Sequence, residues 1–154
     1  MHTPTAAWLL AAVLTAHAAG ATPETVLVVQ RAWVLATPPG ATVAAAYLTL
    51  DNRGHKPDRL VSVSSPRAAR IEVHTILREG DLVKMRRVDP LRVAAGERLT
   101  LEPGGTHLML LDLASPLRAG ERVALSLRFE VAGEILIDAA VLAADDPASG
   151  HKHH

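Results

Sequence analysis

The hydrophobic positions of this chain recur in short runs, many of which alternate with polar residues. Beyond the amino-terminal region, such runs include "TVLVVQRAWVLA", "DRLVSVSS", "LRVAAGERLTLEP" and "ERVALSLRFEVAG", separated by turn-forming stretches such as "PPG", "NRGHKPD", "REGD" and "PGG". Alternation with a period of two is typical of half-buried β-strands, and no long run has helical periodicity. "ATVAAAYL" fits a helix or a strand, and its Thr and Tyr favour a strand. The pattern therefore predicts a single all-β domain, a sandwich or a barrel.

The amino-terminal region differs from the rest of the chain. "TAAWLLAAVLTAHAAGA" is an apolar run followed by small residues, which is typical of a signal peptide. We therefore expect residues 1–21 to be a signal peptide cleaved near residues 18–21, residues 22–143 to form the folded domain, and residues 144–154 to be a flexible tail. The segment "MHTPT" lacks Lys and Arg, so a buried helix or an uncleaved anchor is the alternative. No later segment resembles a membrane span.

Composition excludes several classes of protein. The chain has 16 basic and 16 acidic residues and only 3% aromatic residues, so neither a basic stripe nor a stacking platform predicts nucleic-acid binding. The absence of cysteine excludes disulfide scaffolds, thiol enzymes and the thiolate-ligated copper sites of electron-transfer proteins. The serines of "SVSSP" lack the glycines of a nucleophile elbow, and we expect no enzymatic activity.

Two histidines and two methionines form the most informative pattern. "IEVHTILREGDLVKMRRV" predicts a hairpin that turns at Glu79–Gly80, in which His74 faces Met85 across the two strands. His107 and Met109 are two positions apart in "PGGTHLML", so they lie on one face of a strand, while Leu108 and Leu110 face the core. Glu72 shares the face of His74 and is either a partner that orients the imidazole or an ordinary solvated residue.

Two thioethers and two neutral imidazoles are a soft, uncharged donor set. Thioether sulfur suits Cu(I) and binds hard cations poorly, and Met is not a usual ligand of zinc. Each residue also has a simpler interpretation. Met109 can fill a gap in the core, and either histidine can be an ordinary hydrogen-bonded residue. The sequence pattern by itself leaves copper binding and these structural roles open.

The spacing His74-x10-Met85-x21-His107-x-Met109 resembles the signature of the PCu(A)C family of periplasmic copper chaperones. The segments "RAWVLATPPG", "AAYLTLDN", "LEPGGTHLMLLDL" and "PLRAGERVALSLRFEVAGEI" are also similar to that family, so the resemblance covers about Val28 to Ile137. It implies a cupredoxin-like β-sandwich of Greek-key type, located in the periplasm, that carries Cu(I). It also implies delivery to the CuA centre of cytochrome c oxidase subunit II, alone or alongside a Sco-type copper protein. We expect the chain to be a monomer.

Two features depart from the family pattern or extend it. Members often carry additional methionines just after the first histidine, where this chain has Thr75 and Ile76. The tail histidines resemble a minimal form of the Cu(II)-binding extension of some members, although a solvated tail explains them equally well: His151, His153 and His154. The competing functions are a metal-free sandwich that acts as an interaction module, and periplasmic copper storage or resistance.

Overall fold

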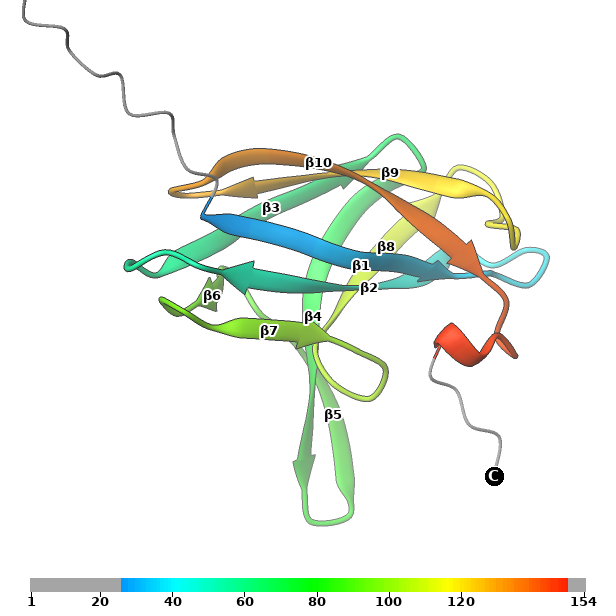
Figure 1. The fold of residues 1–154 in the computed structure, drawn as a ribbon. Helices are drawn as coiled ribbons and strands as arrows, with labels where there is room; N and C mark the ends of the chain where they lie inside the picture. Colours follow the sequence, from blue (N-terminus) through cyan, green and yellow to red (C-terminus); the bar gives the residue numbers. More distant parts are fainter. Residues whose placement is uncertain (1–25, 150–154) are drawn as a thin grey trace, which may run out of the picture.

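The structure is a computed structural model that describes residues 26–149, and these residues form an all-β fold (Figure 1). The expected signal peptide and the tail residues His151, His153 and His154 lie outside this range. A short 3-10 turn, η1 (Pro147–Ser149), follows the last strand. The strands are β1 (Leu27–Leu35), β2 (Val43–Asn52), β3 (Asp58–Ser65), β4 (Ala68–Glu79), β5 (Leu82–Arg87), β6 (Leu91–Val93), β7 (Arg98–Leu101), β8 (His107–Leu113), β9 (Arg122–Phe129) and β10 (Gly133–Leu142).

The strands belong to one sheet that closes on itself. Their order is β5-β4-β8-β2-β1-β10-β9-β3-β6, with β7 paired to β2, and β3 also pairs with β4. This last pairing brings the β4-β8-β2 part of the sheet back to the β10-β9-β3 part, and the two parts enclose the core as a sandwich (Figure 1). The predicted all-β sandwich is thus confirmed. No helix within residues 26–149 has the length and apolar character needed to cross a membrane.

The core is built from alternate positions of the strands. Leu108 and Leu110 of β8 are both fully buried, as predicted, and β9 contributes Val123, Leu125 and Leu127. Because successive side chains of a strand point to opposite faces, residues 107 and 109 of β8 face away from this core. One strand therefore both fills the interior and presents two functional candidates on the outer face.

The segment "LRVAAGERLTLEP" gives two strands, not one. A turn separates β6 from β7, and within it Glu97 N–H donates to the Ala94 carbonyl oxygen at 3.1 Å while Ala94 N–H donates to the Glu97 carboxylate at 2.6 Å. Gly96 adopts a φ of 70°, a conformation that glycine reaches without strain. The turn lets β6 pair with β3 and β7 pair with β2.

The predicted pairing of the β4–β5 hairpin was wrong by two residues. The turn lies at Gly80–Asp81, so that Glu79 pairs with Leu82, Ile76 pairs with Met85 and His74 pairs with Arg87. Gly80 has a φ of 61°, which places the glycine at the first turn position and moves the turn by one residue. Because the pairing moves by an even number of positions, the side chains keep their faces. Met85 is therefore diagonal to His74 on the same face, not directly opposite.

A buried carboxylate fixes the turn between β9 and β10. Asp58, at the start of β3, is only 4% exposed. Its carboxylate accepts hydrogen bonds from the backbone N–H groups of Val131 at 2.9 Å, Ala132 at 2.8 Å and Arg59 at 2.7 Å. A single side chain thus satisfies three backbone donors and joins strands that are far apart in the sequence.

The carboxyl-terminal part of the described chain is ordered through η1. Ser149 is fully buried, and its hydroxyl group donates to the carbonyl oxygen of Asp146 at 2.6 Å. This short turn, Pro147–Ser149, lies within the segment 144–154 that the sequence predicts to be a tail.

Candidate metal centre

The four predicted ligands come together on the outer face of three neighbouring strands. His74 of β4 pairs directly with His107 of β8, and Met109 of β8 pairs with Glu72 of β4. Met85 lies on β5, on the other side of β4, where it pairs with Ile76. All these residues share one face by the strand alternation. The structure therefore gathers the two predicted His-Met pairs, which the sequence placed on separate elements, at one place.

His107 is buried and held in a fixed orientation. Its side chain is only 5% exposed, and its ring lies 6.4 Å from that of Tyr47, centroid to centroid. Its Nδ1 lies 3.0 Å from the carbonyl oxygen of Gly105, an acceptor, so Nδ1 carries the proton and donates. In this tautomer the Nε2 lone pair is free to bind a metal ion, an arrangement typical of metal-ligating histidines.

The turn "PGG" before β8 positions that Gly105 carbonyl group. Gly104 has a φ of 82°, and the turn is closed by hydrogen bonds from Gly105 N–H to the Glu102 carbonyl oxygen at 3.1 Å and from Glu102 N–H to the Thr106 carbonyl oxygen at 3.0 Å. The glycines thus serve the orientation of His107 as well as the start of the strand.

His74 has the opposite tautomer. Its Nε2 lies 2.9 Å from a carboxylate oxygen of Glu72, so Nε2–H donates to the carboxylate. Its Nδ1 is the only buried side-chain nitrogen or oxygen within residues 26–149 that has no hydrogen-bond partner. A buried polar atom without a partner is costly, and a lone pair on an imidazole nitrogen is a metal donor. Nδ1 of His74 and Nε2 of His107 are therefore the two nitrogen donors available at this site.

Glu72 is the partner that orients His74, the interpretation that the sequence left open. The hydrogen bond from His74 is the main cause that lowers the pKa of Glu72 below its ordinary value, burial opposes this shift, and the nearby Arg87 guanidinium also lowers the pKa. Arg87 Nη1 lies 3.5 Å from the other carboxylate oxygen of Glu72. The carboxylate therefore stays ionised at neutral pH and holds the imidazole ring from the side away from Nδ1.

The two imidazole rings are close enough to share one ion. Their centroids are 6.2 Å apart, and a metal–imidazole nitrogen bond is about 2 Å long, so one ion between the rings can reach a nitrogen of each. Within residues 26–149, no three or more His, Cys, Asp or Glu side chains form a metal-binding group. The thioethers of Met85 and Met109 are the soft donors on the same face as the two rings, and thioether sulfur favours a soft ion.

The two methionines differ in exposure. Met109 is partly buried, whereas Met85 is 53% exposed on β5. Of the two positions where family members often carry methionine, Ile76 lies on the ligand face opposite Met85. Thr75 points to the other face, where its hydroxyl group accepts a hydrogen bond from Thr106 at 3.1 Å. Only position 76 could therefore add a donor to this site.

A mild substitution tests the role of Glu72. We expect Glu72→Gln to lower the affinity for Cu(I) about ten-fold, because partners that orient a metal-binding histidine typically contribute ten- to hundred-fold. The amide oxygen can still accept a hydrogen bond but lacks the negative charge. A competition titration with a Cu(I) chelator measures the change. Glu79→Gln is the control, since Glu79 lies at the end of β4 and pairs with Lys84; equal affinities of the two variants would contradict this role.

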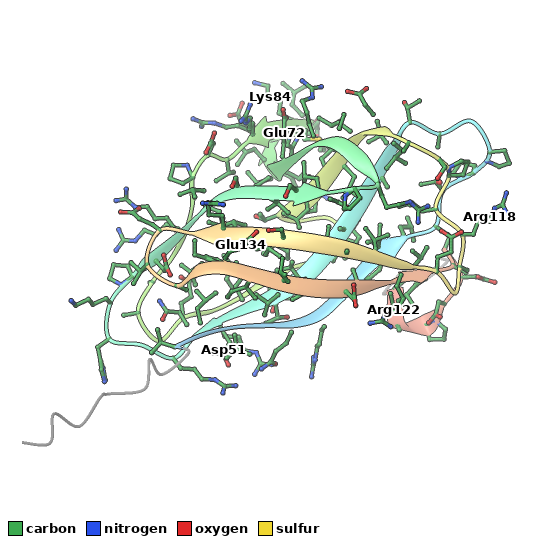
Figure 2. The ribbon with its side chains drawn as sticks, turned by 90° about the horizontal axis from the view of Figure 1, so that it is seen from above. Asp51, Glu72, Lys84, Arg118, Arg122 and Glu134 are labelled. Carbon is green, nitrogen blue, oxygen red and sulfur yellow. The ribbon has the colours of Figure 1, made fainter. Side chains whose placement is uncertain are left out.

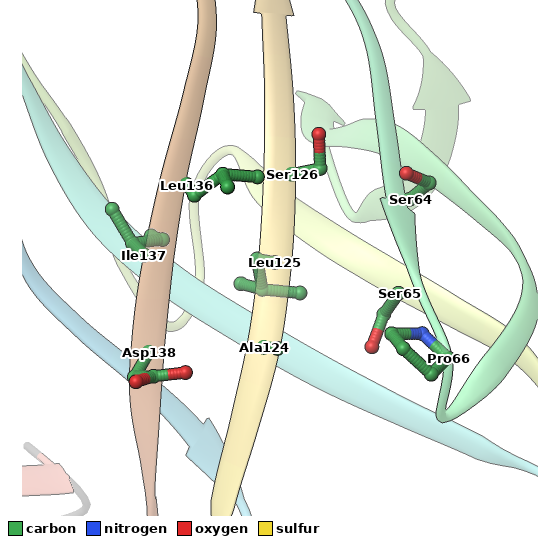
Figure 3. A pocket seen from close by; sticks show the side chains of 9 residues that line it. All are labelled: Ser64, Ser65, Pro66, Ala124, Leu125, Ser126, Leu136, Ile137 and Asp138. Carbon is green, nitrogen blue, oxygen red and sulfur yellow. The ribbon is translucent and has the colours of Figure 1, made fainter.

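A mostly apolar hollow of the described surface lies elsewhere. It has a volume of about 700 Å³ and is formed by β3, β9 and β10 (Figure 3). Its lining is mostly apolar, with Leu136 74% exposed, and includes three serines but no histidine. The hydroxyl group of one of them, Ser126, donates to the carboxylate of Glu134 at 2.5 Å. The hollow shares no residue with the His-Met site.

The fold is that of PCuAC domains. The copper-bound PCuAC domain from PmoF2 superposes with a TM-score of 0.67 at 31% identity, over 77% of this chain and 93% of that one. The solution structure of CuI-DR1885 from Deinococcus radiodurans gives a TM-score of 0.63 at 33% identity, over 84% and 85% of the two chains. Residues 27–141 match the family described as "Putative lipoprotein LpqE-like", and the chain belongs to this family, which is the PCu(A)C family.

Curated relatives extend the comparison beyond solved structures. A protein of Leifsonia xyli named as a putative lipoprotein is 35% identical over 66% of this chain. An uncharacterized protein of Rickettsia prowazekii is 30% identical over 68% of this chain. The matches span 60% and 58% of the lengths of these relatives.

Proposed function

We propose that this protein is an exported copper carrier that binds one Cu(I) through His74, Met85, His107 and Met109. The observation that carries the proposal is the pair of unengaged nitrogen atoms. Nδ1 of His74 is buried without a partner, and Nε2 of His107 is left free by the bond to Gly105. Both rings share a sheet face with the two thioethers. The copper carried by related PCuAC domains supports the choice of metal.

The carrier releases its ion by ligand exchange and not by a chemical reaction. Four neutral donors hold a monovalent ion without adding charge, and thioethers are weaker ligands than thiolates, which allows an incoming acceptor to replace them stepwise. The acceptor that we propose is the CuA centre of cytochrome c oxidase subunit II, directly or together with a Sco-type copper protein. The amino-terminal leader pattern and the lipoprotein name of a relative support export to the periplasm.

The tail histidines form a second proposed site. The last four residues of the chain include three histidines, His151, His153 and His154. Imidazole is a suitable ligand for Cu(II). Cu(II) would bind there independently of the Cu(I) ligands of the folded domain.

Substitution of the thioethers tests the primary site. We expect Met85→Ala and Met109→Ala each to lower the Cu(I) affinity by at least about ten-fold, because each removes a direct donor and even indirect ligand partners contribute that much. The apo-protein is titrated with Cu(I) against a competing chelator, and anomalous scattering at the copper edge locates the ion. Val83→Ala, a control on the same strand as Met85, should leave the affinity unchanged. If both methionine variants bind Cu(I) as tightly as the wild type, the proposed site is wrong.

A further inference from the structure

The β4–β5 hairpin extends from the sandwich as a separate arm. β5 is the end strand of the sheet and pairs only with β4, and every residue from Leu77 to Arg87 is exposed. Figure 1 shows the hairpin projecting away from the other strands. We use "the arm" for residues 77–87. A two-stranded hairpin by itself contributes little stability, so this exposed surface does not serve the core of the fold.

The arm is unusually apolar for such an exposed element. The described residues include eight large exposed hydrophobic side chains, and four of these belong to the arm: Leu77 at 36%, Leu82 at 61%, Val83 at 59% and Met85 at 53%. Exposed apolar groups gathered on an edge strand are a liability unless another surface covers them. Their concentration around one candidate copper ligand indicates a contact surface.

The arm is also basic, although the chain as a whole is neutral. It carries four cationic and two acidic residues, whereas the numbers of acidic and basic residues in the chain are equal. Lys84 lies 3.0 Å from Glu79, and Arg87 lies 3.1 Å from Asp89. Arg78 and Arg86 form no ion pair with any carboxylate of residues 26–149. Two guanidinium groups of the arm are therefore available to an external anion: Arg78 on the face of the candidate ligands, and Arg86 on the opposite face.

We propose that the arm is the docking surface for the copper acceptor, and that the acceptor presents carboxylates around a small apolar patch at its own copper-binding site. The inference rests on the proposed function and adds to it the chemistry of the partner. Met85 is the most exposed of the four candidate ligands, so the exchange of ligands begins there. Val83, on the ligand face, and Leu82, on the other face, then contact the apolar patch, while Arg78 and Arg86 attract the carboxylates.

Electrostatic attraction of this kind affects rates more than affinities. Complementary charges raise association rates about 10- to 1,000-fold at low ionic strength, and salt removes the gain. A change in the charge of the arm should therefore alter the rate of copper removal but not the Cu(I) affinity. This separation distinguishes the docking surface from the copper site itself.

The first experiment measures copper removal by two Cu(I) chelators, the anionic bathocuproine disulfonate and the uncharged neocuproine. For the wild-type chain, we expect the rate with the anionic chelator to fall about ten-fold between about 10 mM and 500 mM salt. The double variant Arg78→Glu, Arg86→Glu should lose about ten-fold in this rate at low salt and show no fall with salt. The rate with neocuproine should not change in either case.

Matched reversals on another part of the surface provide the control. Arg118→Glu with Arg122→Glu changes the charge equally, and Figure 2 shows both residues well away from Lys84 of the arm. With both chelators, this variant should lose copper at the same rates as the wild type, with the same dependence on salt. Equal rates of the arm variant and the wild type with bathocuproine disulfonate would overturn the docking proposal. A chain that fails to bind one Cu(I) in the competition titration would contradict the proposed function instead.

The second experiment uses a protein acceptor, the apo CuA domain of oxidase subunit II. We expect copper transfer to slow with salt, with the arm reversals, and with Leu82→Ser, Val83→Ser, while the last variant leaves the chelator rates unchanged. Transfer that is insensitive to all three changes would overturn the proposal. If the wild type transfers no copper, the recipient named above is wrong, and the chelator rates alone decide the role of the arm.

Discussion

Replacing His107 by alanine is expected to lower the Cu(I) affinity of the protein by at least about 100-fold, the upper end of what even indirect ligand partners contribute. His107 combines three features: it is 5% exposed, its Nδ1 is engaged by Gly105, and its ring faces that of His74 at 6.2 Å. The first two features fix the free lone pair of Nε2 before any ion arrives. Little freedom is lost on binding, so the loss of this ligand should be especially costly.

The measurement is a competition titration of Cu(I) against a chelator, with His55→Ala as the control. His55 lies in the exposed loop between β2 and β3 and should not influence copper. Because His107 is buried, the apo forms are also compared by thermal unfolding, and His107→Gln keeps more of the side-chain volume. Undiminished Cu(I) affinity in a folded His107 variant would remove this residue from the site.

Asp58→Ala is expected to produce the largest loss of stability among single polar substitutions in the described chain. Three backbone N–H groups donate to its buried carboxylate, and hydrogen bonds to charged groups contribute about 1.5–3 kcal/mol each, without being additive. We expect the free energy of unfolding to fall by roughly 3 kcal/mol or more. Asp58→Asn keeps one oxygen acceptor, so its free energy of unfolding should lie between those of Asp58→Ala and the wild type.

Urea unfolding followed by circular dichroism measures this effect, provided that the transition is two-state. Asp138→Ala is the control, because Asp138 is exposed on β10 and surface substitutions of this kind change stability by no more than about 0.5 kcal/mol. A similar small change for Asp58→Ala would show that water replaces the carboxylate as the acceptor of the turn.

The strand period predicted the faces of the site residues but not all their partners. His107 and Met109 share a face because they are two positions apart, and the fully buried Leu108 and Leu110 confirm the alternation. In the hairpin, the expected turn was displaced by one residue, yet Met85 stayed on the face of His74 because the pairing moved by two. The predicted face of each side chain was therefore correct, although every predicted residue pair in the hairpin was wrong.

Contacts between distant strands could not be derived from the sequence pattern. The pairing of His74 with His107 depends on β4 lying beside β8, and nothing local to either strand determines that neighbour. The resemblance to the PCu(A)C family supplied the grouping that the pattern lacked. Glu72 was placed correctly on its face, but its choice between solvent and His74 depends on a rotamer and a tautomer, which residue types do not determine.

Nothing in the sequence around Asp58 indicated that its carboxylate is buried and binds the β9–β10 turn. It follows Pro57 at the end of a polar loop, where an aspartate is ordinarily expected in water. Its burial arises from the β9–β10 turn, which comes more than seventy positions later in the chain. A buried anion that joins two such segments becomes visible only when both are placed in space.

Because side chains alternate along β8, the residues that stabilise the core and the residues proposed to select the metal ion are different ones. Leu108 and Leu110 fill the interior, and the candidate donors His107 and Met109 project from the opposite face of the same strand. A lineage can therefore change the donor atoms, and with them the preferred ion, while the packing of the sandwich is inherited unchanged. Metal specificity can therefore change by substitution of single outward-facing residues, without any change in the residues of the core.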